Sequence, residues 1–166
     1  VELQSKYLLL DFLVKQDVKK LSHEMEVSIK AGDIVGLIYD AFLKQYKIPD
    51  GNEKQESAEQ KEKREHKLKS LNALCVRLVF CLYAEDAGIF GGRGMFHDYL
   101  AEFDARKMRR AITDLFKILD TKLEDRDPYL KDDFPELAAF PYVNGGLFAN
   151  EDIEIPPFTD EIRDLL

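Results

Sequence analysis

The sequence predicts a mainly α-helical fold, a compact multi-helix bundle around a central buried helix, with one small β-hairpin near the C-terminus. Apolar residues recur at three- and four-residue spacing through the first two-thirds of the chain. Five of the six prolines fall after residue 120, and no long alternating run typical of strands occurs. The 166 residues, of which 45% are hydrophobic, are enough for one domain of ordinary size.

Charge and cysteine content exclude several classes of protein. The net charge of −8 excludes a generally basic nucleic-acid-binding surface, and residues 120–166, with 13 acidic and 4 basic side chains, should repel phosphate. Cys75 and Cys81 are six residues apart, roughly 9 Å along a helix, too far for a disulfide. Free thiols fit a reducing cytoplasm, and the longest apolar run is too short to span a membrane. Because residue 1 is Val, we expect a fragment of a longer protein.

The first helix is predicted from one apolar stripe. Ser28 is a suitable N-cap for it, and the sequence Ile48-Pro49-Asp50-Gly51 favours a turn just after it. The stripe consists of Ile34, Leu37, Ile38, Ala41, Phe42 and Tyr46.

Residues 53–70 are almost all polar or charged and predict a solvated helix. The pairs Glu59 with Lys63 and Glu65 with Lys69 have the favourable i,i+4 order. A disordered charged linker is the alternative for the first half of this run. Past Leu68 the same helix becomes apolar on every side, which predicts a central helix surrounded by others and ending at Gly88.

The remaining elements follow a glycine-rich turn at residues 91–94. A short amphipathic piece covers residues 95–103, and Asp104 can cap a further helix that runs to about Asp120. Asn144-Gly145-Gly146 is a strong turn signal, so residues 141–157 predict the small hairpin. The apolar stripe of the further helix consists of Met108, Ile112, Leu115, Phe116 and Leu119.

Three motifs resemble catalytic signatures, but each departs from its signature in context or in a required residue. Pro49-Asp50 followed by Glu59-Gln60-Lys61 spells the PD-(D/E)xK nuclease pattern, whose acids hold a divalent metal from adjacent strands, yet this run favours a helix. Phe90-Gly91-Gly92-Arg93-Gly94 matches the FxGxG turn of methyltransferases but follows a helix rather than a strand. Ile155-Pro156-Pro157-Phe158 lacks the polar amide of an adenine-methylating loop. We therefore predict no catalytic, cofactor-binding or metal-binding residue, with a cryptic nuclease site as the alternative.

Two sets of charged residues call for an explanation. Arg77, Cys81 and Glu85 share a helix face, so we expect Arg77 to neutralise Glu85 and turn amides to hold Asp86. A basic ridge lies opposite the stripe of the further helix. It is either a solvated face or a contact with phosphate or an acidic neighbouring domain. The ridge consists of Arg106, Arg109, Arg110 and Lys117.

Three stretches then carry a family resemblance: RLVFCLYAEDAGIF at residues 77–90, LFKILDT at 115–121 and FPYVNGGLF at 140–148. In this order they resemble the helical spacer region of MmeI-like type IIL restriction-modification enzymes and related large DNA adenine methyltransferases. The likeness runs from about Val27 to the end, including IPPFTDEIRDLL from Ile155. We expect a spacer domain at residues 27–166, after a helical junction at residues 1–26.

The resemblance also implies the parent's organisation. Such proteins carry a PD-(D/E)xK nuclease, absent in some relatives, then the spacer, an S-adenosylmethionine-dependent adenine methyltransferase and a target-recognition domain. S-adenosylmethionine and magnesium then belong to the other domains, and the partners are the methyltransferase and nuclease domains, with DNA bound through the parent. Glu85 and Asp86 would fix the end of the central helix. A turn would pack against the spacer core or dock the methyltransferase, and it consists of Tyr142, Asn144, Gly145, Gly146, Leu147 and Phe148. A stand-alone helical interaction module is the alternative.

Overall fold

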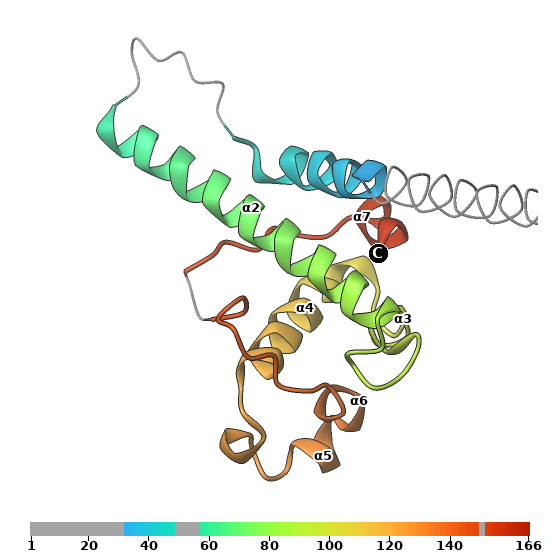
Figure 1. The fold of residues 1–166 in the computed structure, drawn as a ribbon. Coiled ribbons are helices and arrows are strands. Elements are labelled where there is room, and N and C mark those ends of the chain that lie inside the picture. Colours follow the sequence, from blue (N-terminus) through green and yellow to red (C-terminus); the bar gives the residue numbers. More distant parts are fainter. Residues whose placement is uncertain (1–31, 49–56, 150–151) are drawn as a thin grey trace, which may run out of the picture. The chain divides into compact units, whose positions relative to one another are not determined.

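The computed structural model describes residues 32–48, 57–149 and 152–166, and the chain divides into two compact units, residues 1–37 and 38–166. Helices dominate, and no strand occurs in the described ranges, which confirms the mainly α prediction (Figure 1). After a helix at residues 32–46, the elements are α2 (Ala58–Asp86), α3 (Met95–Ala101), α4 (Ala105–Asp120), the 3-10 turn η1 (Leu123–Asp125), α5 (Leu130–Asp133), α6 (Pro135–Ala138) and α7 (Asp160–Leu165).

The helix at residues 32–46 is partly as predicted. It ends at Lys47, which has a positive φ of 45°, just before the proline at position 49. Its proposed N-cap, Ser28, lies outside the described residues. Four residues of the predicted stripe are buried, whereas Ile34 and Leu37 are exposed. The buried four are Ile38, Ala41, Phe42 and Tyr46.

Helix α2 is one continuous helix of 29 residues that passes from a charged half to an apolar half. A capping box begins it, because Ser57 and Gln60 each accept the other's backbone amide. The predicted Glu59–Lys63 pair is present, with 2.6 Å between its charged groups. The solvated helix is thus confirmed from residue 58 onward, while residues 53–56 lie outside the described part of the chain.

The prediction that α2 is buried on every side is wrong. Leu71, Leu74 and Leu78 are fully buried, but the side chains of Val76 and Tyr83 are 55% and 62% exposed. Because the side chains that pack on α2 cover only part of its circumference, the face that carries Val76 and Tyr83 stays open. The apolar residues on every side of α2 therefore led to an overestimate of how much of this helix is buried.

The end of α2 agrees with the sequence. The amide of Ile89 donates to the carbonyl of Ala84 at 2.8 Å, and the amide of Gly88 donates to the carbonyl of Glu85 at 3.0 Å. This is a Schellman motif, which requires a left-handed residue at Gly88, where φ is 72°.

Helix α4 also forms as predicted. The side chain of Asp104 accepts the amide of Lys107 at 3.0 Å, and every residue of the predicted apolar stripe is buried. Between α2 and α4 lie the aromatic residues of the core, among which the rings of Phe90 and Tyr99 both pack edge-on against Phe140. This core fixes how α2, α3 and α4 are held together.

The predicted hairpin at residues 141–157 is wrong. Residues 141–149 are irregular, because their backbone groups bond to helices rather than to a second strand. The amide of Val143 donates to the carbonyl of Leu119 at 2.8 Å, and the carbonyls of Leu147 and Ala149 accept from Arg77. Two of the hairpin's positions, residues 150 and 151, lie outside the described ranges.

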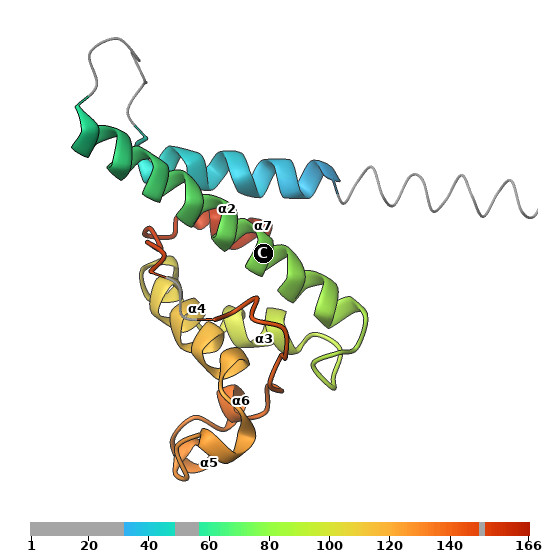
Figure 2. The ribbon, with the colours of Figure 1, turned by 60° about the vertical axis from the view of Figure 1, so that its left-hand side comes forward.

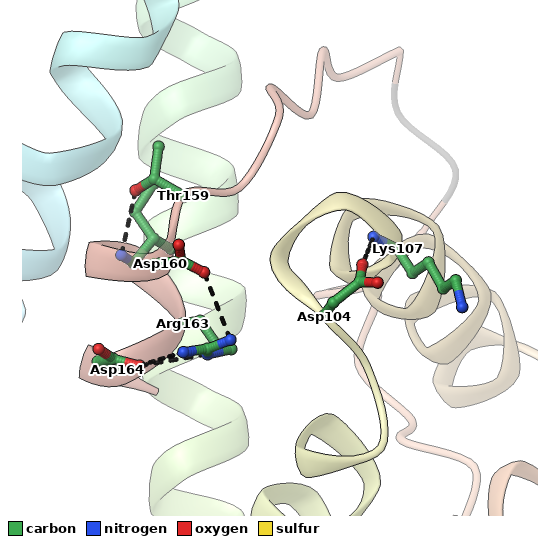
Figure 3. A network of polar contacts seen from close by, with 7 residues as sticks. Asp104, Lys107, Thr159, Asp160, Arg163 and Asp164 are labelled. Carbon is green, nitrogen blue, oxygen red and sulfur yellow. Dashed lines mark hydrogen bonds and ion pairs between the residues drawn. The ribbon is translucent and has the colours of Figure 1, made fainter.

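The C-terminal segment, residues 152–159, runs extended across the helices. The hydroxyl of Tyr46 donates to the carbonyl of Glu154, whose amide donates to the hydroxyl of Ser70 at 2.9 Å. The ring of Phe158 packs edge-on against Phe42 at 5.1 Å. The segment leads into α7, whose first turn is capped by the Thr159 hydroxyl (Figure 3). The Ile155-Pro156-Pro157-Phe158 motif is therefore a packing element of this fold.

Candidate functional site

Arg77 is the buried centre of the candidate site. Its side chain is only 5% exposed, although α2 is open on the neighbouring face. Its Nε donates to the carbonyl of Leu147 at 2.9 Å, and a terminal nitrogen donates to the carbonyl of Ala149 at 3.0 Å. The guanidinium also lies over the ring of Phe116, 5.6 Å from its centroid. Arg77 thus ties α2 to the 147–149 turn and to α4.

The predicted turn residues divide into an inner and an outer group. Phe148 is 3% exposed and packs against Phe80 of α2 and Phe116 of α4, at 5.6 Å and 5.2 Å between ring centroids. Tyr142 and Leu147 are half-buried. The residues Asn144, Gly145 and Gly146 are exposed. Packing against the core is therefore observed for Phe148, while docking of a methyltransferase domain by the turn stays a prediction.

A shallow hollow lies between α2 and this turn. Arg77 and Leu147 form part of its wall, and the exposed Val76 side chain adds an apolar edge. The remaining lining residues are Lys69, Asn72, Ala73 and Gly146. The hollow belongs to the face that α2 leaves open.

Glu85 has a different partner from the one expected. Its carboxylate accepts the backbone amide of His97 at 3.0 Å, within the first turn of α3. The N-cap of α3 is Gly94, which has no side chain to offer, so Glu85 supplies the missing acceptor. The positive end of the α3 dipole compensates a charge that α2 disfavours at its own C-terminus.

Asp86 is exposed, and the expected role of the turn amides is not the observed one. The amides of Gly88, Ile89 and Gly91 all donate to main-chain carbonyls. The turn at residues 88–94 is therefore stabilised by its own backbone.

Two residues of the basic ridge are bonded to other groups of the protein, and the other two are exposed. Arg109 donates through Nε to the carbonyl of Ile155 at 2.6 Å, and Arg110 pairs with Asp114 at 2.7 Å. That hydrogen bond with Asp114 raises the pKa of Arg110. Arg106 and Lys117 are exposed. Within the described residues, two of the four cations of the ridge are therefore bonded inside the protein, and Arg106 and Lys117 are available to bind phosphate.

Sequence reasoning missed Arg126, which organises the chain after α4. It donates to four carbonyls, at distances between 2.8 and 3.3 Å. Burial lowers the pKa of Arg126. No local sequence pattern predicts this role. Arg126 stands between two aspartates in the sequence, which would instead suggest an ion pair on the surface. The four carbonyls belong to Ile118, Thr121, Ala138 and Phe140.

The other reactive side chains are also placed by the structure. Burial raises the pKa of Cys75 to about 11, and that of Cys81 is raised as well, so both thiols stay protonated near neutrality. Glu59 and Lys61 of the nuclease pattern lie in the first turns of α2, not on strands, and Asp50 lies outside the described residues. Over the described ranges, no cluster of three metal-ligating side chains occurs, and none of the helices there could cross a membrane.

Within the described residues, these contacts define a helical domain in which Arg77 and Arg126 bind main-chain carbonyls around an apolar core. Residues 69–148 match the family model described as "MmeI, helicase spacer domain". The chain is 32% identical over 161 residues to DNA methyltransferase A of Bacillus subtilis (strain 168), covering 93% of this chain and 16% of that protein. It also resembles the solved type IIL restriction-modification enzyme MmeI in complex with DNA. That match has a TM-score of 0.60 and 31% identity, and covers 82% of this chain and 16% of the other.

The spacer resemblance is thereby confirmed. The family model matches residues 69–148 of this chain, which spans 16% of the length of each of these two relatives.

Proposed function

We propose that this chain is the non-catalytic helical spacer of a DNA modification enzyme. In this role it holds an S-adenosylmethionine-dependent adenine methyltransferase domain, and a nuclease domain where the parent has one, in a fixed relation on DNA. The observation that carries the proposal is the use of two arginines: the buried Arg77 and the half-buried Arg126 donate to main-chain carbonyls of other segments. Guanidinium groups that are shielded from water and bonded to several carbonyls stiffen a chain of short helices.

The dimensions of α2 suit a connector. Its 29 residues span about 44 Å at the usual rise of an α-helix. The extended C-terminal segment is bonded to this helix through Ser70 and to α4 through Arg109. A force applied at either part would therefore be transmitted to the same core.

The similarity to two large DNA-modifying proteins supports the same role. Each is matched over only 16% of its length, so most of each relative lies outside the matched region. S-adenosylmethionine and magnesium would bind in those other domains of the parent. DNA would be bound chiefly by the parent, with Arg106 and Lys117 as the available local phosphate contacts.

The test uses the full-length parent protein with Arg77→Met. The variant should leave the affinity for S-adenosylmethionine unchanged and lower the turnover of DNA methylation, because the methyltransferase is intact but less well positioned. Arg93→Met removes an exposed arginine and serves as the control. Unchanged methylation turnover in a variant whose spacer is measurably loosened would contradict the positioning role.

The cryptic nuclease is tested in the same protein with Glu59→Ala. Glu59 is bonded to Lys63 on the surface of α2, so the change should leave methylation and any DNA cleavage intact. Loss of metal-dependent cleavage in this variant would overturn the non-catalytic assignment.

A further inference from the structure

An exposed apolar group lies beyond the end of α4. We call residues 122–136 the acidic lobe; it contains η1 and α5 and the start of α6 (Figures 1 and 2). Within it the side chains of Leu123, Tyr129 and Phe134 are 71%, 67% and 59% exposed. Single exposed apolar residues are ordinary, but three large ones within twelve residues of one small lobe are typical of an interaction surface.

The lobe is held in place from its inner side. Arg126 bonds it to the last turn of α4 and to the 138–140 segment, and Leu137 just beyond it is buried. The Asp127 carboxylate accepts the amide of Tyr129 at 2.9 Å. The exposed side chains therefore project from a fixed backbone, which lowers the entropy lost on binding.

The charge of the lobe indicates the chemistry of its partner. Acidic residues outnumber basic ones in the lobe by six to three, and none of its carboxylates forms an ion pair with a described residue. Such a surface repels nucleic acid and attracts a basic protein surface. The carboxylates belong to Asp120, at the end of α4, and to Glu124, Asp125, Asp127, Asp132, Asp133 and Glu136.

We propose that the acidic lobe docks onto a basic, apolar-pocketed surface of another domain of the same enzyme. Leu123, Tyr129 and Phe134 are the anchors, and the carboxylates form a charged rim. This inference rests on the proposed function, which supplies the other domains. A second copy of this chain is a poorer partner, because two arginines of its basic ridge, Arg109 and Arg110, are already bonded.

Hydroxyl-radical footprinting of the full-length protein tests the proposal. Tyr129 and Phe134 should be oxidised severalfold more slowly than in the denatured protein, at every protein concentration and without DNA. High salt should speed their oxidation, since screening weakens the rim. Oxidation of both at the denatured rate, protection that appears only at high protein concentration, or protection that appears only with DNA would each overturn the proposal.

A variant separates this inference from the proposed function. Leu123→Ser with Tyr129→Ser and Phe134→Ser changes only exposed side chains, and should enlarge the full-length protein in small-angle X-ray scattering. Tyr83→Ser, of similar exposure but on α2, is the control and should not. Unchanged size in the triple variant contradicts the docking surface, even where Arg77→Met lowers methylation. Unchanged methylation in Arg77→Met contradicts the positioning role, even where the lobe is protected.

Discussion

Replacing Arg77 by Met should loosen the junction between α2, α4 and the 147–149 turn. The carbonyls of Leu147 and Ala149 would each lose a donor in a partly buried setting, at a cost of about 1–3 kcal/mol apiece. Loss of the contact with Phe116 adds about 1 kcal/mol. Allowing for water that enters to replace part of the bonding, the junction should lose about 3–5 kcal/mol of local stability.

Amide hydrogen exchange in the full-length protein measures this loss locally. At about 1.4 kcal/mol per factor of ten, protection of the buried part of α2 should fall by about two to four decades. Arg77→Lys should be intermediate, because an ammonium cannot reproduce the planar two-carbonyl geometry. Exchange at α2 that matches the Arg93→Met control would refute the reasoning that Arg77 is a structural centre.

Three further predictions concern other sites. Glu85→Ala should cost about 1 kcal/mol at the start of α3, seen as faster amide exchange at residues 95–101, and unchanged exchange would contradict the capping role. Burial raises the pKa of Cys75 from 9.0 to about 11. The neutral thiol therefore contributes its full stability below pH 9, and this contribution is lost as the pH rises toward 11. The unfolding midpoint should fall over this pH range in the wild-type protein, and the part of the fall that Cys75 causes should be absent in Cys75→Val. Arg106→Ala with Lys117→Ala should weaken DNA binding by the full-length protein less than about tenfold and reduce its salt dependence; unchanged binding would leave a solvated face.

Local signals in the sequence predicted most helix boundaries. Asp104, Gly88 and the proline at position 49 each act on their own backbone neighbours, and each marks an end that the structure confirms. The buried stripe of α4 follows from helical spacing for the same reason, since one face of a short helix meets one core.

Long-range bonds were not predictable in this way. The Asn144-Gly145-Gly146 signal predicts a turn, and residues 145 and 146 do bend, but the flanking carbonyls are taken by Arg77, about seventy residues earlier. A hairpin needs those same groups, so one distant arginine decides between the two structures. Arg126 is a second case, because its four acceptors come from two separate segments.

The open face of α2 shows the limit of composition. Val76 and Tyr83 read as core residues by type, yet nothing in a single sequence states how many neighbours surround a helix. The interpretation of the charged residues depends on the same missing information. Glu85 accepts a hydrogen bond from the His97 amide of α3, whereas the sequence predicted an interaction with Arg77 on α2.

The distance between the two domains that the proposed spacer would connect tests its role most directly. One spin label is placed in the methyltransferase domain and one in the domain on the other side of the spacer. Pulsed electron–electron double resonance then measures the distribution of distances between the two labels. A rigid spacer predicts a narrow distribution in the wild-type protein and a broad one in Arg77→Met, with the affinity for S-adenosylmethionine unchanged. A wild-type distribution already as broad as that of the variant would contradict it.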